Sequence, residues 1–152
     1  MNLKRVVVTG LGALTPIGNT VSDYWDGLIS GKSGADRITY FDCSNFKTQF
    51  ACELKGFDPE DYMDRKLSRK MDRFAQYAIV SSDEAIKDAF PNLEKLDMDR
   101  IGVIWGAGIG GLETFQNEVL NFASGNGFPR FNPFMIPKMI PDIAPGIISI
   151  RN

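Results

Sequence analysis

The chain contains no histidine among its 152 residues. Histidine is the commonest general base in enzymes, the usual activator of a serine or cysteine nucleophile, and the commonest zinc ligand. The sequence also has no Cys-x-x-Cys motif, because its only two cysteines are Cys43 and Cys52. It therefore predicts no metal site, and it lacks most of the side chains on which acid–base and nucleophilic catalysis depend.

The chain also lacks an excess of charge, a long apolar run and a secretion signal. With 17 basic and 19 acidic residues its net charge is −2, which argues against binding nucleic acid or a membrane through bulk charge. No apolar run approaches the roughly 20 residues that span a bilayer. The apolar N-terminal stretch is broken by Thr9, Gly10, Gly12 and Pro16, and no cleavage site follows. Two cysteines are too few for a secreted disulfide scaffold, so we expect a cytoplasmic protein.

What the chain does contain is enough apolar sequence for one core, arranged as alternating strands and helices. Hydrophobic residues make up 43% of it. The β-branched run Val6–Val8 predicts a buried strand, residues 101–105 a second strand, and residues 50–54 a further short one. Strands that alternate with helices predict an α/β layered fold with an at least partly parallel sheet.

The sequence predicts three helices and one proline-rich loop. Residues 20–29 read as a helix with Thr20 as its N-cap, and residues 112–123 as another. Between them, residues 68–90 carry apolar side chains at helical spacing and predict the longest helix, with Ser68 as its N-cap. Residues 124–146 are dense in glycine and proline and predict an ordered loop.

A glycine-rich turn follows the predicted strand at residues 101–105. Gly106, Gly108 and Gly111 satisfy the G-x-G-x-x-G spacing of a dinucleotide-binding turn. That motif needs a second strand with an acidic residue about 20 positions later, whereas residues 126–134 show neither strand pattern nor carboxylate. Dinucleotide binding is therefore disfavoured. Two interpretations remain: a tight turn that binds nothing, or a turn that presents the side chain of Ile109 at a functional position.

Four blocks of sequence, taken together, resemble a known enzyme family. They are RVVVTGLGALTPIGNTVSDYWDGLISGKSG, RKMDRFAQYAIVSSDEAI, GVIWGAGIGGLETF and NPFMIPKMIPDIAPGIISIR. In this order they are similar to the N-terminal part of the beta-ketoacyl-acyl-carrier-protein synthases, and most similar to the type II elongating condensing enzymes of bacterial fatty acid synthesis. The similarity covers essentially the whole chain.

The resemblance implies a fold, an assembly and a reaction. It implies a thiolase-like α-β-α-β-α fold, a cytoplasmic homodimer, no cofactor, and acyl carrier protein as the partner. The reaction is a decarboxylative Claisen condensation by an acyltransferase with a nucleophilic cysteine and two histidines. All three follow the residues 148–151 in the family, so residues 1–152 are expected to be an N-terminal part truncated before the nucleophile, with no catalytic residue and no activity alone. Cys43 and Cys52 do not match the nucleophile's position.

The resemblance also implies an acyl pocket. It makes Ile109 the gate between the nucleophile and the fatty-acyl tunnel. It places Phe134 and Met135 in a segment that crosses the dimer interface and closes the partner's tunnel. Many relatives have phenylalanine where this chain has Met135. A flexible thioether adapts its shape more easily than an aromatic ring, so the resemblance does not fix the preferred acyl length. The alternative interpretation of Phe134 and Met135 is ordinary core packing.

A basic cluster is the last feature carried over. The resemblance matches Lys66, Arg69 and Lys70 to residues that meet the acidic carrier protein, and Arg130 to a second basic contact. If Ser68 caps the long helix, Arg69 and Lys70 lie in its first turn, where the helix dipole disfavours each cation by about 0.3–1 kcal/mol. Such a placement favours an outside partner. The alternative is a solvated charged face.

The sequence is compatible with two further functions. Related chain-length subunits keep the fold but lack the cysteine, so the protein could be a non-catalytic partner of this type. The other alternative is the disfavoured dinucleotide-binding oxidoreductase.

Overall fold

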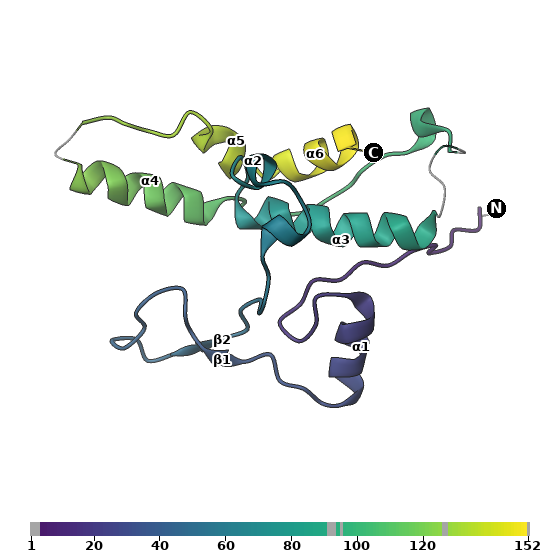
Figure 1. The fold of residues 1–152 in the computed structure, drawn as a ribbon, viewed down its shortest axis with the longest axis horizontal. Coiled ribbons are helices and arrows are strands. Elements are labelled where there is room, and N and C mark those ends of the chain that lie inside the picture. Colours follow the sequence, from purple (N-terminus) through teal and green to yellow (C-terminus); the bar gives the residue numbers. More distant parts are fainter. Residues whose placement is uncertain (1–3, 91–93, 95, 126–127, 152) are drawn as a thin grey trace. The chain divides into compact units, whose positions relative to one another are not determined.

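The computed structural model describes residues 4–90, 94, 96–125 and 128–151. Its elements, in chain order, are α1 (Val21–Ile29), β1 (Asp36–Arg37), β2 (Phe50–Ala51), η1 (Pro59–Asp61), α2 (Arg65–Ser68), α3 (Arg73–Ala89), η3 (Met98–Arg100), α4 (Leu112–Ser124), α5 (Met135–Met139) and α6 (Ile143–Arg151) (Figure 1). No helix within these residues is long and apolar enough to cross a membrane.

The chain divides into two compact units. The first comprises Met1–Phe57 and Asp83–Pro91, and the second comprises Asp58–Ser82 and Asn92–Asn152. Helix α3 contributes its C-terminal part to the first unit and its N-terminal part to the second.

Helix α1 of the first unit begins and ends where the sequence predicts. The hydroxyl of Thr20 accepts a hydrogen bond from the backbone N–H of Asp23 at 3.1 Å, which satisfies one of the free donors of the first turn. Asp23 also places a negative charge at this end of the helix, where the dipole favours it. After the helix, Gly31 adopts a φ of +66°, a conformation that glycine reaches without steric cost.

Two carboxylates of α3 hold the N-terminal segment of the first unit. The two oxygens of Glu84 accept hydrogen bonds from the backbone N–H groups of Ala13 and Val21, each at 2.8 Å. One turn further along, Asp88 accepts from the N–H of Leu11 at 3.0 Å. These bonds satisfy backbone donors in a segment that forms no sheet of its own.

The predicted strands are only partly present. β1 and β2 pair antiparallel, with Asp36 opposite Ala51 and Arg37 opposite Phe50, so the short strand expected in residues 50–54 is confirmed at its first two positions. The strands expected at Val6–Val8 and at residues 101–105 are wrong for this structure. A β-branched run favours an extended backbone, but a strand also needs a neighbour to pair with its N–H and C=O groups. Within the described residues, neither segment has one.

The long helix predicted over residues 68–90 begins only at Arg73, as α3, and Ser68 belongs to a separate short helix, α2. α2 is capped by Asp64, whose side chain accepts a hydrogen bond from the N–H of Leu67 at 2.9 Å, and it ends at Ser68. Ser68 is therefore the last residue of α2 and not the N-cap of α3. The side-chain amide of Gln76 donates to the carbonyl of Ser68 at 3.0 Å in a buried setting. This bond joins the end of α2 to the first turns of α3.

Among the described elements of the second unit, helix α3 supplies the largest share of buried residues. Ala75, Ala78 and Ile79 are completely buried. They lie three and four residues apart, so they share one face of the helix. Helix α6 buries Ala144 and Ile148, which lie four residues apart and so share a face.

Two helices lie in the segment expected to be a loop. α4 is confirmed where residues 112–123 predicted it, but α5 and the start of α6 fall within residues 124–146. Pro137 and Pro145 are each the third residue of their helix. In the first turn the missing N–H of proline costs no hydrogen bond, so proline density did not exclude helices here.

Candidate functional site

The C-terminal end of the glycine-rich turn lies tightly against the backbone of α5. Gly110 has a φ of +82°, and a Cβ at this position would collide with the carbonyl oxygen of Met139. A Cβ at Gly111 would collide with the carbonyl oxygen of Lys138. The N–H of Gly111 donates to the carbonyl of Met139 at 3.0 Å. Glycine is required at these two positions because another backbone approaches closely.

The N-terminal part of the turn is open. A Cβ at Gly106 or at Gly108 would meet nothing within 4 Å. Ile109, between the open and the tight glycines, is 69% exposed. The spacing that resembles a phosphate cradle thus combines two open glycines with a third that packs against protein backbone.

A buried carboxylate holds the start of α4. Asp72, the residue before α3, is 8% exposed, and its Oδ2 accepts hydrogen bonds from the N–H of Thr114 at 2.9 Å and from its hydroxyl at 2.5 Å. The N-cap of α4 is Gly111, which has no side chain to cap with. Asp72 therefore acts as a cap from another element and places its charge where the helix dipole favours it. The sequence patterns did not predict this cap, although a carboxylate within the apolar pattern of residues 71–79 indicates a buried, hydrogen-bonded side chain.

The start of α5 is held to α4 by a chain of polar contacts. Glu118 accepts a hydrogen bond from the N–H of Asn132 at 3.0 Å, and the side-chain oxygen of Asn132 accepts from the N–H of Phe134 at 2.9 Å. Phe134 is 44% exposed, and Met135 is half-buried as the first residue of α5. Neither side chain is fully buried in the core of the second unit.

The structure brings together two residues that sequence analysis assigned to different sites. The ammonium of Lys70, a predicted carrier contact, lies 5.8 Å from the ring centroid of Phe134, a predicted acyl-pocket residue. This distance is near the outer limit of a cation–π contact. The predicted carrier surface and the predicted pocket segment therefore adjoin within the second unit.

Arg69 and Lys70 do not lie in the first turn of the long helix, where the sequence predicted them. Arg69 is the C-cap of α2 and Lys70 follows it, so neither is in the first turn of α3. A cation at the C-terminal end of a helix is favourable, and the inference of an outside partner from an unfavourable dipole is wrong. Lys66 and Arg69 are exposed and form no ion pair within the described residues, whereas nearby Arg65 pairs with Glu60 at 3.3 Å.

Arg130 lies in the segment between α4 and α5, whereas the other predicted carrier contacts lie in or directly after α2. It is exposed and lines a shallow hollow of about 400 Å³ with Asn121, Gly125 and Phe128.

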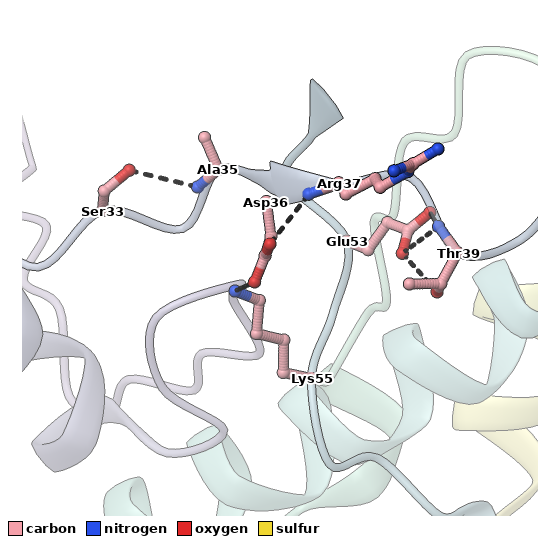
Figure 2. A network of polar contacts seen from close by, with 7 residues as sticks. All are labelled: Ser33, Ala35, Asp36, Arg37, Thr39, Glu53 and Lys55. Atoms are coloured by element: carbon pink, nitrogen blue, oxygen red, sulfur yellow. Dashed lines mark hydrogen bonds and ion pairs between the residues drawn. The ribbon is translucent and has the colours of Figure 1, made fainter. Parts of the chain in front are cut away.

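The first unit contains a surface network around β1 that Figure 2 shows. Asp36 accepts hydrogen bonds from the ammonium of Lys55 at 3.0 Å and from the N–H of Arg37 at 2.8 Å. The hydrogen bond from Lys55, followed by the one from Arg37 and the charge of Lys55, lowers the pKa of Asp36. Beside it, Glu53 accepts from the N–H and the hydroxyl of Thr39. These contacts join the segments that contain β1 and β2.

Comparison with known proteins identifies the family. The model of the beta-ketoacyl synthase family's N-terminal domain matches residues 3–152. The chain belongs to this family. It is 47% identical over 148 residues to 3-oxoacyl-acyl-carrier-protein synthase 2 of Synechocystis sp., and 48% identical over 147 residues to the enzyme of the same name from Staphylococcus aureus. Each alignment covers 97% of the chain but 35% of the relative, so the chain corresponds to the N-terminal part of these proteins.

Solved ketosynthases share the fold of this beta-ketoacyl synthase chain. One belongs to a complex of a type II polyketide synthase acyl-carrier protein with its ketosynthase bound to the hexaketide, with a TM-score of 0.77, 30% identity, and coverage of 98% of this chain and 39% of that one. The ishigamide ketosynthase/chain length factor has a TM-score of 0.78 at 26% identity, with coverage of 95% and 36%. The expected thiolase-like α/β fold is confirmed for this N-terminal part.

Proposed function

We propose that the protein containing this chain is a beta-ketoacyl-acyl-carrier-protein synthase of fatty acid elongation. The observation that supports this most is the family match over residues 3–152 together with 47–48% identity to two 3-oxoacyl-acyl-carrier-protein synthases. The 152 residues are the N-terminal part of one ketoacyl synthase domain. The assembly is a cytoplasmic homodimer, and the nucleophilic cysteine and the two histidines belong to sequence outside this chain.

The proposed reaction has two transfers. The acyl group passes from the carrier thioester to the cysteine thiolate, and the carrier thiol is released. Malonyl-carrier then loses carbon dioxide, and the resulting carbanion attacks the acyl-cysteine carbonyl and expels the thiolate. A thiolate suits both steps because it is a strong nucleophile and a good leaving group, and oxyanion donors stabilise the charge that develops on the attacked carbonyl oxygen.

Within this proposal the chain shapes the acyl tunnel. Ile109 is the gate beside the nucleophile, and Phe134 and Met135 close the tunnel of the partner subunit. The exposure of Ile109 on an open, glycine-rich turn supports its role, because an apolar side chain at 69% exposure is available to contact an acyl chain. Phe134 and Met135 are likewise only partly covered by the second unit.

The chain also supplies cations for the carrier protein. Lys66, Arg69, Lys70 and Arg130 are all exposed, which supports contact with an acidic partner. Opposite charge raises the encounter rate and orients the carrier. The similarity to a ketosynthase that was solved in complex with its acyl-carrier protein agrees with this assignment.

The test is a condensation assay on the natural full-length protein. Purified protein, acyl-carrier and radioactive malonyl-carrier should yield beta-ketoacyl-carrier and carbon dioxide in equal amounts. The 152-residue chain alone is the matched control, and we expect no product from it. Decarboxylation without condensation by the full-length protein, or product from the short chain, would contradict the proposal.

A non-catalytic chain-length subunit is the second candidate. The structural similarity to the ishigamide ketosynthase/chain length factor is the observation that favours it. The residue at the nucleophile position of the natural protein separates the two: cysteine supports the synthase, whereas glutamine supports the non-catalytic subunit.

A further inference from the structure

We propose that Asp72 is a positioning residue that anchors the glycine-rich turn and thereby sets the place of Ile109. The inference rests on the proposed function, in which Ile109 gates the acyl tunnel. The contacts that support it all lie within the second unit.

The first step is the bond between Asp72 and the start of α4. A carboxylate that is 8% exposed is stable when hydrogen bonds satisfy it, and Asp72 receives two from Thr114, one from the N–H and one from the hydroxyl. The same oxygen lies within 3.0 Å of where a Cβ of Gly111 would be. The first turn of α4 is thus held by a side chain outside α4, only three residues after the end of the glycine-rich turn at Gly111.

The second step is the contact on the other side of the turn. Gly110 and Gly111 lie against the carbonyls of Met139 and Lys138, and the N–H of Gly111 donates to the carbonyl of Met139. The turn is therefore clamped at its C-terminal end, between Asp72 and α5. Its earlier glycines, at positions 106 and 108, have open space around them. Ile109 is the last residue before the clamp.

Lys70 and Asp72 lie in one short segment that contacts both α5 and α4. Lys70, two residues earlier, lies over the ring of Phe134, and Phe134 is the N-cap of α5. The segment 70–72 therefore contacts both the start of α5 and the start of α4. One short segment links the proposed carrier contact, the proposed tunnel residue Phe134 and the turn that carries Ile109.

Hydrogen exchange in the natural full-length protein tests the anchor. Asp72→Ala should speed amide exchange in residues 106–114 by about tenfold, because the first turn of α4 loses its cap. Asp72→Asn, which keeps an acceptor oxygen of the same shape, should restore most of the protection, and Thr114→Val should give an intermediate effect. Asp88→Ala is the matched control, since it removes a carboxylate that accepts from the N–H of Leu11 in the first unit. Exchange in residues 106–114 that is unchanged in Asp72→Ala would overturn the anchor.

Steady-state kinetics tests the effect on the gate. In Asp72→Ala the KM for long acyl substrates should rise about five- to tenfold, and for the shortest acyl substrate much less, while kcat for the shortest substrate stays within about twofold. A fall in kcat that is equal for every acyl length would mean a merely structural role and would overturn the positioning role. A wild-type protein that folds but does not condense would overturn the proposed function and the gating role with it. The exchange measurement would then still decide whether Asp72 anchors the turn.

Discussion

At the residue scale, glycine does two different things within one short motif. Gly110 and Gly111 are needed because the α5 backbone approaches them, and Gly110 also has a positive φ. Gly106 and Gly108 have free space around them. The spacing alone could not separate these roles, because backbone contact with a distant segment leaves no mark in the local sequence.

Alanine substitutions at Gly110 and Gly106 should therefore have different effects on the free energy of unfolding. Gly110→Ala should destabilise the natural protein by about 2–4 kcal/mol, because a left-handed backbone and a collision with the carbonyl of Met139 add together. Gly106→Ala, the matched control, should be neutral or stabilise by about 0.4–1 kcal/mol, since alanine restricts the unfolded chain. Denaturant midpoints measure both, and equal midpoints for the two variants would contradict the clamp.

Charge reversal at Lys66 and Arg69 tests the proposed contact surface for the carrier protein. Both cations are exposed without an ion pair in the described chain, so Lys66→Glu or Arg69→Glu should slow carrier association about three- to tenfold at low salt, and the difference should shrink as salt rises. Lys47→Glu changes the charge equally at an exposed position outside the cluster and serves as control. Stopped-flow association with acyl carrier protein gives the rates; the same slowing in Lys47→Glu would indicate an effect of net charge only.

At the element scale, the end of α2 and the start of α4 involve contacts from other elements. α2 ends at Ser68, whose carbonyl accepts from the side chain of Gln76, and α4 starts under the cap of Asp72. Helical periodicity predicted the apolar face of α3, but it placed the start of the helix before Arg73, where α3 begins. A side chain from elsewhere can end or begin a helix, and periodicity does not register it.

The β1–β2 pair offers a test that depends on pH. Because Lys55 lowers the pKa of Asp36 below its usual 3.8, the stabilising contact is present at neutral pH and is lost as pH falls through that lowered value. Carboxyl chemical shifts should therefore titrate below 3.8 for Asp36, and Lys55→Ala should raise this midpoint towards 3.8. Because both side chains are exposed, the effect on global stability should be small. An unchanged midpoint in Lys55→Ala would assign the shift to the N–H of Arg37 instead.

At the scale of the whole molecule, the chain presents more apolar surface than a stable monomer normally shows. Val6, Val8, Ile104 and Ile150 are each at least 80% exposed, and three apolar side chains of α1 are exposed as well: Trp25, Leu28 and Ile29. Since the chain spans about 35% of the relatives it matches, the rest of the natural protein or a second subunit is expected to cover these residues.

The 152-residue chain alone should therefore self-associate. Exposed apolar side chains and extended segments without a paired neighbour both favour aggregation. Light scattering of the purified chain should give a mass well above 16.9 kDa, while the natural full-length protein should behave as a defined oligomer. A monodisperse monomer of the short chain would contradict this expectation.

The sequence by itself determined the family, the helices α1 and α4 and the apolar face of α3, because these depend on local spacing, capping residues and long matching blocks. Only the tertiary structure decided which glycines are tight, where α3 begins, that Lys70 adjoins Phe134, and that Asp72 caps α4. The contacts at the glycines, at Lys70 and at Asp72 join segments far apart in the chain, whereas the start of α3 lies beside a bond between Gln76 and Ser68, eight residues apart. The strands expected at Val6–Val8 and at residues 101–105 are absent for a related reason. A strand forms only when another segment pairs with it, and the local sequence does not show whether that segment is present.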